Sequence, residues 1–308
     1  MKSSLWIFLL FSIHPVFSSD FKECNLRNGL PVTVAKCRAA DSLTVAYLGG
    51  SITEQEGWRV FSQEIIRQQF PGVTISEVNA TIGGTGSDFG LYRLQESVLK
   101  HQPDLLMVEF AVNDDGMPAE KIRRQMESIV RLTKSQASPP DILFVYTFKE
   151  DFLVHLNKQQ LPPSVMAMEE IAVHYGIPSI NYIPEVYRLI GAKKLLIKGN
   201  QQILNGMQVF SPDGVHPFVE TGHRIYAEVF ARAFSSLAGY SGVTCTKLPA
   251  PLSAGIQLKP SLIPFFWLHL PGKWSGVEPF TTKLQRQLST FGGSIVTNDE
   301  RNASLTIY

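Results

Sequence analysis

The sequence has almost no net charge. Its 28 lysines and arginines are balanced by 27 aspartates and glutamates, which leaves a formal charge of +1 over 308 residues, and no long basic run occurs. Proteins that bind nucleic acid or anionic membrane surfaces use an excess of positive charge, so we predict neither partner. With 44% hydrophobic and 18% charged residues the chain can bury a normal core, which indicates one sizeable domain plus additional residues.

A long hydrophobic run is also missing. The most apolar stretch, Leu5 to Phe17, is about 13 residues long and contains a histidine and a proline, whereas a helix that spans the ~30 Å hydrocarbon core needs about 20 apolar residues. A lysine before it and small residues after it are typical of a secretory signal peptide cleaved near Ser18 or Ser19. We therefore predict a signal peptide over residues 1–19, a secreted protein and no stable membrane insertion, with an uncleaved anchor as the alternative.

Cysteine is scarce, with three residues at Cys24, Cys37 and Cys245. In a secreted chain a disulfide between Cys24 and Cys37, which are close together before the first core strand, would tie down the mature N-terminus. Three cysteines cannot all pair within one chain, and the sequence does not decide which is free. None lies in a block with a histidine partner, so we predict no catalytic cysteine.

Patterns for metal and nucleotide binding are absent too. No two histidines have the H-x-x-x-H or H-E-x-x-H spacing that holds zinc. Gly83-Gly84-Thr85-Gly86 resembles a phosphate-binding loop, but no Walker lysine follows it, and Phe89 stands where the dinucleotide-binding pattern has its third glycine. We predict a protein without metal or other cofactor.

The sequence does contain a serine, an aspartate and a histidine in an informative arrangement. Ser51 follows the apolar run Leu43 to Leu48 in the block Gly-Gly-Ser-Ile-Thr, and a turn with Asp213 and His216 comes about 160 residues later. A serine hydroxyl needs a histidine to take its proton and a carboxylate to fix the tautomer of that histidine. The spacing allows Asp213 to face one ring nitrogen of His216 while the other faces Ser51. We predict these residues as a catalytic triad, although each segment alone is more often an ordinary turn.

Two further blocks carry candidate donors for an oxyanion hole. Gly84, in the glycine-rich stretch of residues 79–87, can bring a backbone N–H close to a negative charge because it has no Cβ. Asn113 follows the apolar run Leu105 to Val112 and can donate a side-chain N–H to the same oxygen. A strand-to-helix turn and an ordinary Asn-Asp-Asp-Gly turn are the alternative interpretations.

Taken together and in this order, the four blocks resemble the SGNH hydrolases, the superfamily of GDSL-like esterases and lipases, over roughly Leu43 to Leu237. The resemblance implies that Ser51 is the nucleophile. It also implies that the N–H of Ser51, the N–H of Gly84 and the side chain of Asn113 form the oxyanion hole. The Asp-Gly-Val-His turn supplies the other two triad members by the same comparison.

Two details qualify the resemblance. Gly83 and Gly86 are the neighbouring alternatives to Gly84 in the alignment of the second block. The family's usual Gly-Asp-Ser is Gly-Gly-Ser here, with Gly50 in place of an aspartate that is not a triad member. The α/β-hydrolases are the rival fold, but their nucleophile elbow, G-x-S-x-G, is not met, because Thr53 stands in place of its second glycine. The sequence therefore favours the SGNH hydrolases.

Apolar runs and helical stretches alternate along the chain. The runs are short and rich in Val, Ile and Leu, as expected of parallel strands buried on both faces: Leu43–Leu48, Val73–Val78, Leu105–Val112, Ile142–Tyr146 and Pro178–Ile183. The helical stretches between them are Arg59–Phe70, Phe89–Lys100, Ala119–Gln136 and Ser164–Tyr175. This alternation predicts a three-layer α/β/α sandwich around a five-stranded, mainly parallel sheet, the architecture of SGNH hydrolases and flavodoxin-like proteins.

The chain changes character after its last predicted helix. That helix, Thr221–Leu237, has an apolar stripe that we expect to pack on the core and to brace the turn of Asp213 and His216. After Gly242, prolines punctuate a segment without helical period, and β-prone stretches follow. We predict a hydrolase domain over residues 20–242 and a proline-rich linker with a small β-rich region over residues 243–308.

The function predicted from these observations is that of a secreted serine esterase. Because no long amphipathic lid is evident, we favour short acyl groups, with O-acetyl groups on carbohydrate as the first candidate substrate. A lipolytic acylhydrolase is the second candidate. A carbohydrate-binding or interaction protein that keeps the scaffold without turnover is the non-enzymatic alternative. The sequence predicts no oligomeric state.

Overall fold

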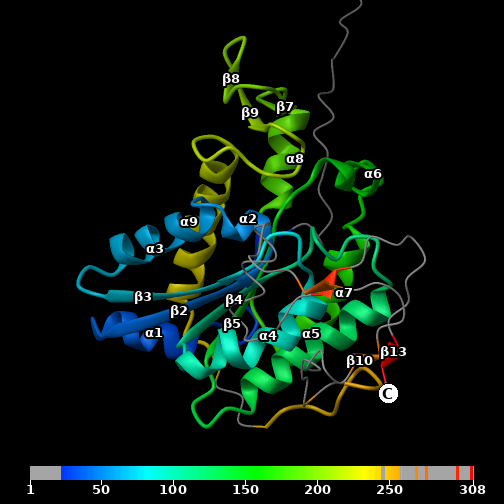
Figure 1. The fold of residues 1–308 in the computed structure, drawn as a ribbon. Helices are drawn as coiled ribbons and strands as arrows, with labels where there is room; N and C mark the ends of the chain where they lie inside the picture. Colours follow the sequence, from blue (N-terminus) through cyan, green and yellow to red (C-terminus); the bar gives the residue numbers. More distant parts are fainter. Residues whose placement is uncertain are drawn as a thin grey trace, which may run out of the picture.

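The computed structural model describes residues 22–243, 247–256 and 258, and beyond them the backbone of four two-residue strands. A six-stranded sheet lies at its centre, in the order β1-β6-β5-β4-β2-β3 (Figure 1). The strands are β1 (Cys24–Asn25), β2 (Ser42–Gly49), β3 (Thr74–Thr81), β4 (Leu105–Glu109), β5 (Asp141–Tyr146) and β6 (Ser179–Asn181). The last five are parallel, and β1 pairs with β6 in the antiparallel direction.

The five predicted strands are therefore confirmed. Every residue of β4 and β5 is buried, as the continuous apolar runs predicted for strands covered on both faces. The edge strand β3 is mostly exposed until its last two residues. The sixth strand, β1, was not predicted, because two residues are too few to make a pattern.

Helices cover both faces of the sheet (Figure 1). The longer ones are α1 (Pro31–Arg38), α3 (Trp58–Gln69), α4 (Ser87–Ser97), α5 (Ala119–Lys134), α7 (Pro163–Tyr175), α8 (Ile183–Gly191) and α9 (Gly222–Gly239). Helix α4 packs on α5 and α5 on α7, whereas α3 packs on α9. The predicted three-layer α/β/α sandwich is confirmed, with the five expected helices beginning and ending within a few residues of their predicted limits.

The direction of the strand order reverses between β2 and β4. The chain leaves β2 through α3 toward β3 on one side, and leaves β4 through α5 toward β5 on the other. Right-handed crossovers in opposite directions put these connections on opposite faces. Ligands of open parallel sheets bind at such a point, outside the carboxyl ends of the strands. Here those ends carry the residues that follow β2 and β4.

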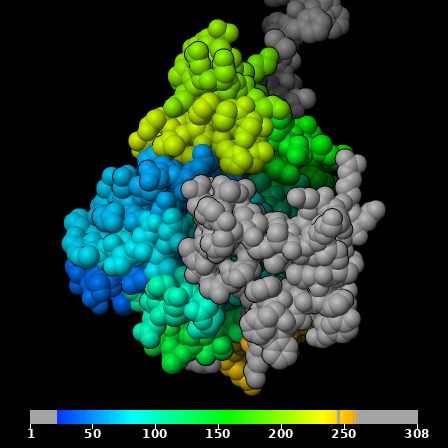
Figure 2. All heavy atoms as spheres, in the orientation of Figure 1, coloured from blue at the N-terminus to red at the C-terminus, as the bar shows by residue number. Residues whose placement is uncertain are grey.

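A second, smaller sheet is formed by the residues that come between α8 and α9 in the sequence. Its strands are β7 (Leu195–Lys198), β8 (Ile203–Leu204) and β9 (Met207–Ser211), in the order β7-β9-β8. It stands at the top of the molecule, above α8 (Figures 1 and 2). The sequence did not predict this sheet, because its strands are short and partly exposed. Strand β9 leads directly into the turn that holds Asp213.

The segment after α9 runs back along helix α5. The carboxylate of Glu127 on α5 accepts the backbone N–H groups of Leu252 and Ser253, each at 2.6 Å. Arg131 donates to the carbonyl oxygen of Pro249 at 2.8 Å. Further on, β10 (Leu268–His269) pairs with β13 (Thr306–Ile307), and β11 (Ser275–Gly276) with β12 (Val296–Thr297). The domain boundary after residue 242 stays a prediction.

Two cysteines are free thiols, so the disulfide expected between Cys24 and Cys37 is not formed. Proximity in sequence was misleading, because the two side chains enter different environments. The sulfur of Cys24 lies 3.8 Å from the carbonyl oxygen of Ala233 on α9, whereas Cys37 is part of α1 and its side chain is buried in the core. Burial raises the pKa of each thiol to about 11. Cys245 and the predicted signal peptide lie outside the described residues.

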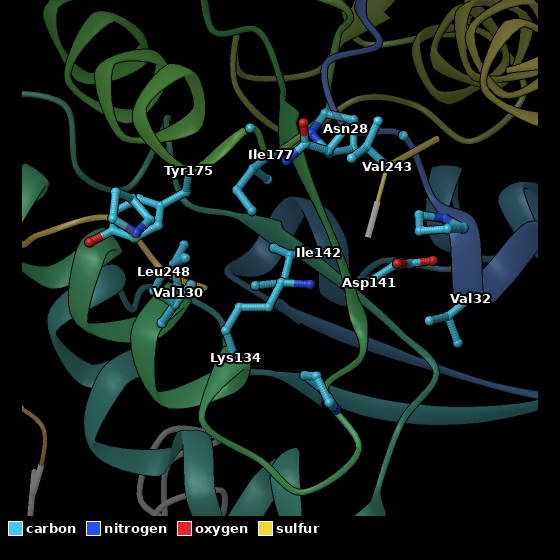
Figure 3. A pocket seen from close by; sticks show the side chains of 16 residues that line it. Asn28, Val32, Val130, Lys134, Asp141, Ile142, Tyr175, Ile177, Val243 and Leu248 are labelled. Atoms are coloured by element: carbon cyan, nitrogen blue, oxygen red, sulfur yellow. The ribbon is translucent and has the colours of Figure 1, made fainter. Parts of the chain in front are cut away.

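A cavity of about 320 Å³ opens at the amino ends of β5 and β6. Figure 3 shows its apolar walls, with Lys134 at the end of α5 and Asp141 at the start of β5 beside them. The carboxylate of Asp141 already accepts the backbone N–H of Thr33 at 2.7 Å. This cavity lies at the opposite end of the strands from Ser51, so the predicted chemistry is not located there.

Candidate active site

The predicted nucleophile lies where β2 ends and a short helix begins. Ser51 is the first residue of α2 (Ser51–Glu54), and Gly50 precedes it as the N-cap in an extended conformation. The carbonyl groups of Gly50 and Ser51 accept the first helical hydrogen bonds, from the N–H groups of Glu54 and Gln55. The change from strand to helix therefore happens at the serine itself, which presents its side chain at the carboxyl edge of the sheet.

The three predicted triad residues come together in the structure. Ser51 Oγ lies 2.8 Å from Nε2 of His216, and Nδ1 of the same ring lies 2.6 Å from Oδ2 of Asp213. The hydroxyl, the imidazole and the carboxylate thus form one continuous chain of hydrogen bonds. This is the arrangement in which an imidazole can take a proton from a serine while a carboxylate holds the ring.

The turn that carries His216 is held by its own aspartate. Oδ1 of Asp213 accepts the backbone N–H groups of Val215 and His216 at 2.8 Å, and Gly214 takes the left-handed backbone (φ +87°) that the turn requires. Burial by itself would raise the pKa of Asp213, but the hydrogen bonds from the His216 side chain and these N–H groups outweigh it and lower the pKa. A charged Asp213 favours the tautomer with a proton on Nδ1, so that Nε2 can accept from Ser51.

The glycine-rich block lies against the serine. The N–H of Ile82 donates to the carbonyl oxygen of Gly49 at 3.1 Å, which ties this block to the end of β2. A Cβ added to Gly83 would lie 3.5 Å from Cβ of Ser51, and Gly84 next to it has a left-handed backbone (φ +77°) that favours glycine. The structure therefore brings the predicted oxyanion glycine, Gly84, and its alternative Gly83 together within one turn beside the serine.

Asn113 reaches the same place from β4, the neighbour of β2. A Cβ added to Gly50 would lie 2.2 Å from Oδ1 of Asn113, so the amide side chain occupies the space in front of Gly50. This contact gives the reason for the Gly-Gly-Ser sequence. No side chain fits at residue 50 while Asn113 keeps this position.

The residue after Asn113 was not predicted to matter, yet it connects two of the blocks. Oδ1 of Asp114 accepts the backbone N–H of Ser87 at 2.9 Å, at the start of α4. Burial raises the pKa of Asp114 to about 6. The signal in the sequence was that Asp114 is the second of three polar residues directly after a buried apolar run, which fitted an ordinary turn equally well.

A second carboxyl group lies buried beneath the nucleophile. Glu109 ends β4 beside Gly49 in the sheet, and its two oxygens accept the hydroxyl groups of Thr53 and Thr147, each at 2.8 Å. Burial raises the pKa of Glu109 to about 7. An acidic residue inside the apolar run Leu105–Val112 was the available signal for this position.

His223 lies under the turn of His216 as part of a directed hydrogen-bond chain. Its Nδ1 accepts the backbone N–H of Trp58 at 3.1 Å, which leaves its proton on Nε2, 3.3 Å from Oε1 of Gln55. The amide of Gln55 then donates to the carbonyl oxygen of Pro217 at 3.2 Å. Burial lowers the pKa of His223 to about 3, so the ring is neutral near pH 7.

The described residues contain neither a metal-binding cluster nor a membrane-spanning helix. Among them, no group of three or more histidine, cysteine, aspartate and glutamate side chains is placed to hold a metal ion. Within the same part of the chain, none of the helices combines the length and the apolar character needed to cross a membrane.

Known proteins resemble this chain in sequence and in fold. Esterase TesA of Pseudomonas aeruginosa is 24% identical over 216 residues, which are 67% of this chain and 94% of TesA. A two-domain esterase active on acetylated mannans, crystallised with mannopentaose, superposes with a TM-score of 0.68 at 24% identity, over 92% of this chain and 72% of that one. A variant of Axe2, an acetyl-xylooligosaccharide esterase from Geobacillus, gives a TM-score of 0.50 at 19% identity, over 66% and 97%. No protein-family model matches the sequence.

These similarities confirm the resemblance to the SGNH hydrolases that the four blocks predicted, and the fold is the one that this superfamily has. The prediction of a carboxylic ester hydrolase of the SGNH type is confirmed at the level of the class.

Proposed function

We propose that the protein is a secreted serine esterase that removes short acyl groups, above all O-acetyl groups, from carbohydrate. The observation that carries this proposal is the unbroken hydrogen-bond chain from Ser51 Oγ through His216 to Asp213, at the carboxyl edge of the sheet. The glycine-rich turn lies against Ser51 and Asn113 lies against the preceding Gly50, so both can supply hydrogen-bond donors to an oxyanion.

The reaction follows from these positions. His216 takes the proton of Ser51 through Nε2 as Oγ attacks the ester carbonyl, and the carbonyl oxygen becomes an oxyanion. The N–H groups of Ser51 and Gly84 and the side-chain amide of Asn113 hold that oxygen. The intermediate collapses, His216 gives its proton to the departing alkoxide, and an alcohol leaves. Water, deprotonated by His216, then attacks the acyl-enzyme and releases the carboxylic acid with regeneration of Ser51.

The surroundings of the site support a hydroxyl-rich alcohol. Lys149 pairs with Asp115, two residues beyond Asn113, at 2.8 Å. Glu150 donates its backbone N–H to the carbonyl oxygen of Gly214 at 2.8 Å, and its carboxylate pairs with Lys198 at 2.6 Å. Charged pairs thus flank the turn that holds Asp213. Such groups can form hydrogen bonds with sugar hydroxyls, whereas a long alkyl chain would only desolvate them.

The relatives support the same substrate class. One structural relative is described as active on acetylated mannans, and another is an acetyl-xylooligosaccharide esterase. We propose that this protein acts on acetylated carbohydrate as well.

A substrate series tests the proposed function. We expect hydrolysis of p-nitrophenyl acetate to be faster than that of the butyrate, with the octanoate slowest, and acetate to be released from acetylated mannan or xylan. Ser51→Ala should abolish each activity while its melting temperature stays close to that of the wild type. Activity that rises with chain length would favour a lipolytic acylhydrolase instead. A folded protein that hydrolyses no ester would favour the non-catalytic alternative.

Secretion is a separate part of the proposal, supported by the signal-like pattern of residues 1–19. N-terminal sequencing of the protein recovered from the medium should start near residue 19 or 20. Recovery of the chain with its Met1 intact, from inside the cell only, would contradict secretion.

A further inference from the structure

A buried arginine lies directly behind the turns that surround Ser51. Arg93 is on α4, and it is one of the largest fully buried side chains of the described residues, with 1% of its surface exposed. Its guanidinium donates to two backbone carbonyl oxygens, that of Ala80 and, at 3.2 Å, that of Gly49. Ala80 is the second-last residue of β3, and Gly49 is the last residue of β2. One side chain thus binds both strands from which the glycine-rich turn and the nucleophile turn emerge.

The charge of this arginine is not balanced in the usual way. In the part of the chain that the structure describes, burial alone acts on it and lowers its pKa to about 10, with no neighbouring carboxylate contributing. The guanidinium therefore stays protonated near pH 7. Its Nε is buried without a hydrogen-bond partner among the described residues. A buried cation costs folding free energy unless it is compensated, and two neutral carbonyl groups compensate it only in part.

The two turns also bind each other at the point that Arg93 holds. The carbonyl oxygen of Gly49 accepts both the N–H of Ile82 and the guanidinium of Arg93. Two residues after Gly49 comes Ser51, and two residues after Ile82 comes Gly84, the residues whose N–H groups the mechanism uses. A shift of either strand end would move one of these donors away from the oxyanion.

We infer that Arg93 is a positioning residue for the oxyanion hole: it locks the two strand ends that carry the N–H donors and places a positive charge behind the oxygen that becomes negative. This inference rests on the proposed esterase function. Preorganised dipoles and charges aimed at a developing negative charge stabilise the transition state more than the bound substrate. Loss of Arg93 should therefore lower kcat and leave KM nearly unchanged.

Three variants separate positioning from a general loss of stability. Arg93→Met keeps the apolar stem and removes the charge and both carbonyl contacts, whereas Arg93→Lys keeps the charge. Arg131→Met is the matched control. Arg131 also donates to a backbone carbonyl, but this one belongs to Pro249 in the segment after α9, away from the turns that surround Ser51. Melting temperatures of all variants are measured first, and kinetics on p-nitrophenyl acetate follow at a temperature where each is folded.

We expect Arg93→Met to lower kcat by about 10- to 100-fold, somewhat less than the loss of a direct oxyanion donor, with KM within about twofold of the wild type. Arg93→Lys should recover part of that loss, and Arg131→Met should keep the wild-type kcat. If Arg93→Met does not fold, a wild-type kcat in folded Arg93→Lys overturns the inference and a lowered kcat at constant KM supports it.

Two other results overturn the inference. One is a wild-type kcat in folded Arg93→Met. The other is an equal loss of kcat in Arg93→Met and Arg131→Met, which would indicate a general structural effect. If the wild-type protein itself hydrolyses no ester, the proposed function fails and the inference fails with it. If the wild type is active and the loss of Arg93 leaves kcat unchanged, only the inference fails.

Discussion

At the scale of single residues, the site combines groups whose positions depend on one another. Gly50 and Asn113 are the clearest pair, because the amide of Asn113 fills the space in which any side chain at residue 50 would lie. Position 50 therefore tolerates only glycine as long as Asn113 remains in place. The aspartate that the SGNH family usually has before its serine would displace Asn113 here.

This dependence predicts a non-additive pair of substitutions. Gly50→Ala should push Asn113 out of position and lower kcat by about 10²-fold, as expected when one oxyanion donor is lost. Asn113→Ala should do the same by removing that donor. Because both changes remove the same interaction, the double variant should be no slower than the slower single variant, within about twofold. Losses that multiply in the double variant would show that the two residues act independently.

Glu109 gives a prediction about pH and stability. Its folded-state pKa of about 7 lies above the ~4.3 of an exposed glutamate, so between these values the folded state holds a proton that the unfolded state has lost. Stability linked to Glu109 is therefore complete below about pH 4 and decreases as the pH rises to about 7. Glu109→Gln, which keeps the shape of the side chain, removes this dependence.

We expect the melting temperature of Glu109→Gln to exceed that of the wild type at pH 8, and the difference to shrink as the pH falls from 7 to 5. Thermal unfolding at four or five pH values measures it. Asp114, whose pKa burial also raises, is present in both proteins and so cancels in the comparison. A difference that is constant with pH would mean that Glu109 is ionised in the folded protein throughout this range.

At the scale of elements, sequence patterns were informative where an element is long and buried. Strands β4 and β5 are covered on both faces, so their residues are apolar without interruption and could be predicted. Strands β7, β8 and β9 have two to five residues and exposed positions, which leaves no periodic pattern. Their sheet nevertheless positions the turn of Asp213, so an element that the sequence did not reveal supports a residue that it did.

The segment after α9 is attached to helix α5 mainly by the side chain of Glu127. Glu127 accepts two backbone N–H groups from residues 252 and 253 and the hydroxyl of Tyr175. We expect Glu127→Ala to release this segment. Limited proteolysis should then cut between residues 247 and 256 several-fold faster than in the wild type, while kcat is unchanged because Ser51 lies at a different edge of the sheet. Equal cleavage rates in the two proteins would show that other contacts hold the segment.

At the scale of the whole molecule, the order of motifs carried more information than any one of them. Ser51, Asn113 and His216 are far apart in sequence, and each stands in a segment that is usually an ordinary turn. Ser51 and Asn113 share the carboxyl edge because they follow the parallel strands β2 and β4, whose ends meet there. His216 reaches the same place from β9 of the second sheet. The supporting residues Arg93, Glu109 and Gln55 could not be predicted, because their roles depend on contacts between elements rather than on a local pattern.

The central claim is that Ser51 is a nucleophile activated by His216. A fluorophosphonate probe reacts with activated serines, so peptide mapping by mass spectrometry after brief labelling tests the claim directly. The account predicts a single label on Ser51, none in Ser51→Ala, and labelling of His216→Gln at least about 10²-fold slower than that of the wild type. A label on another residue, or labelling of Ser51 at the wild-type rate in His216→Gln, would contradict it.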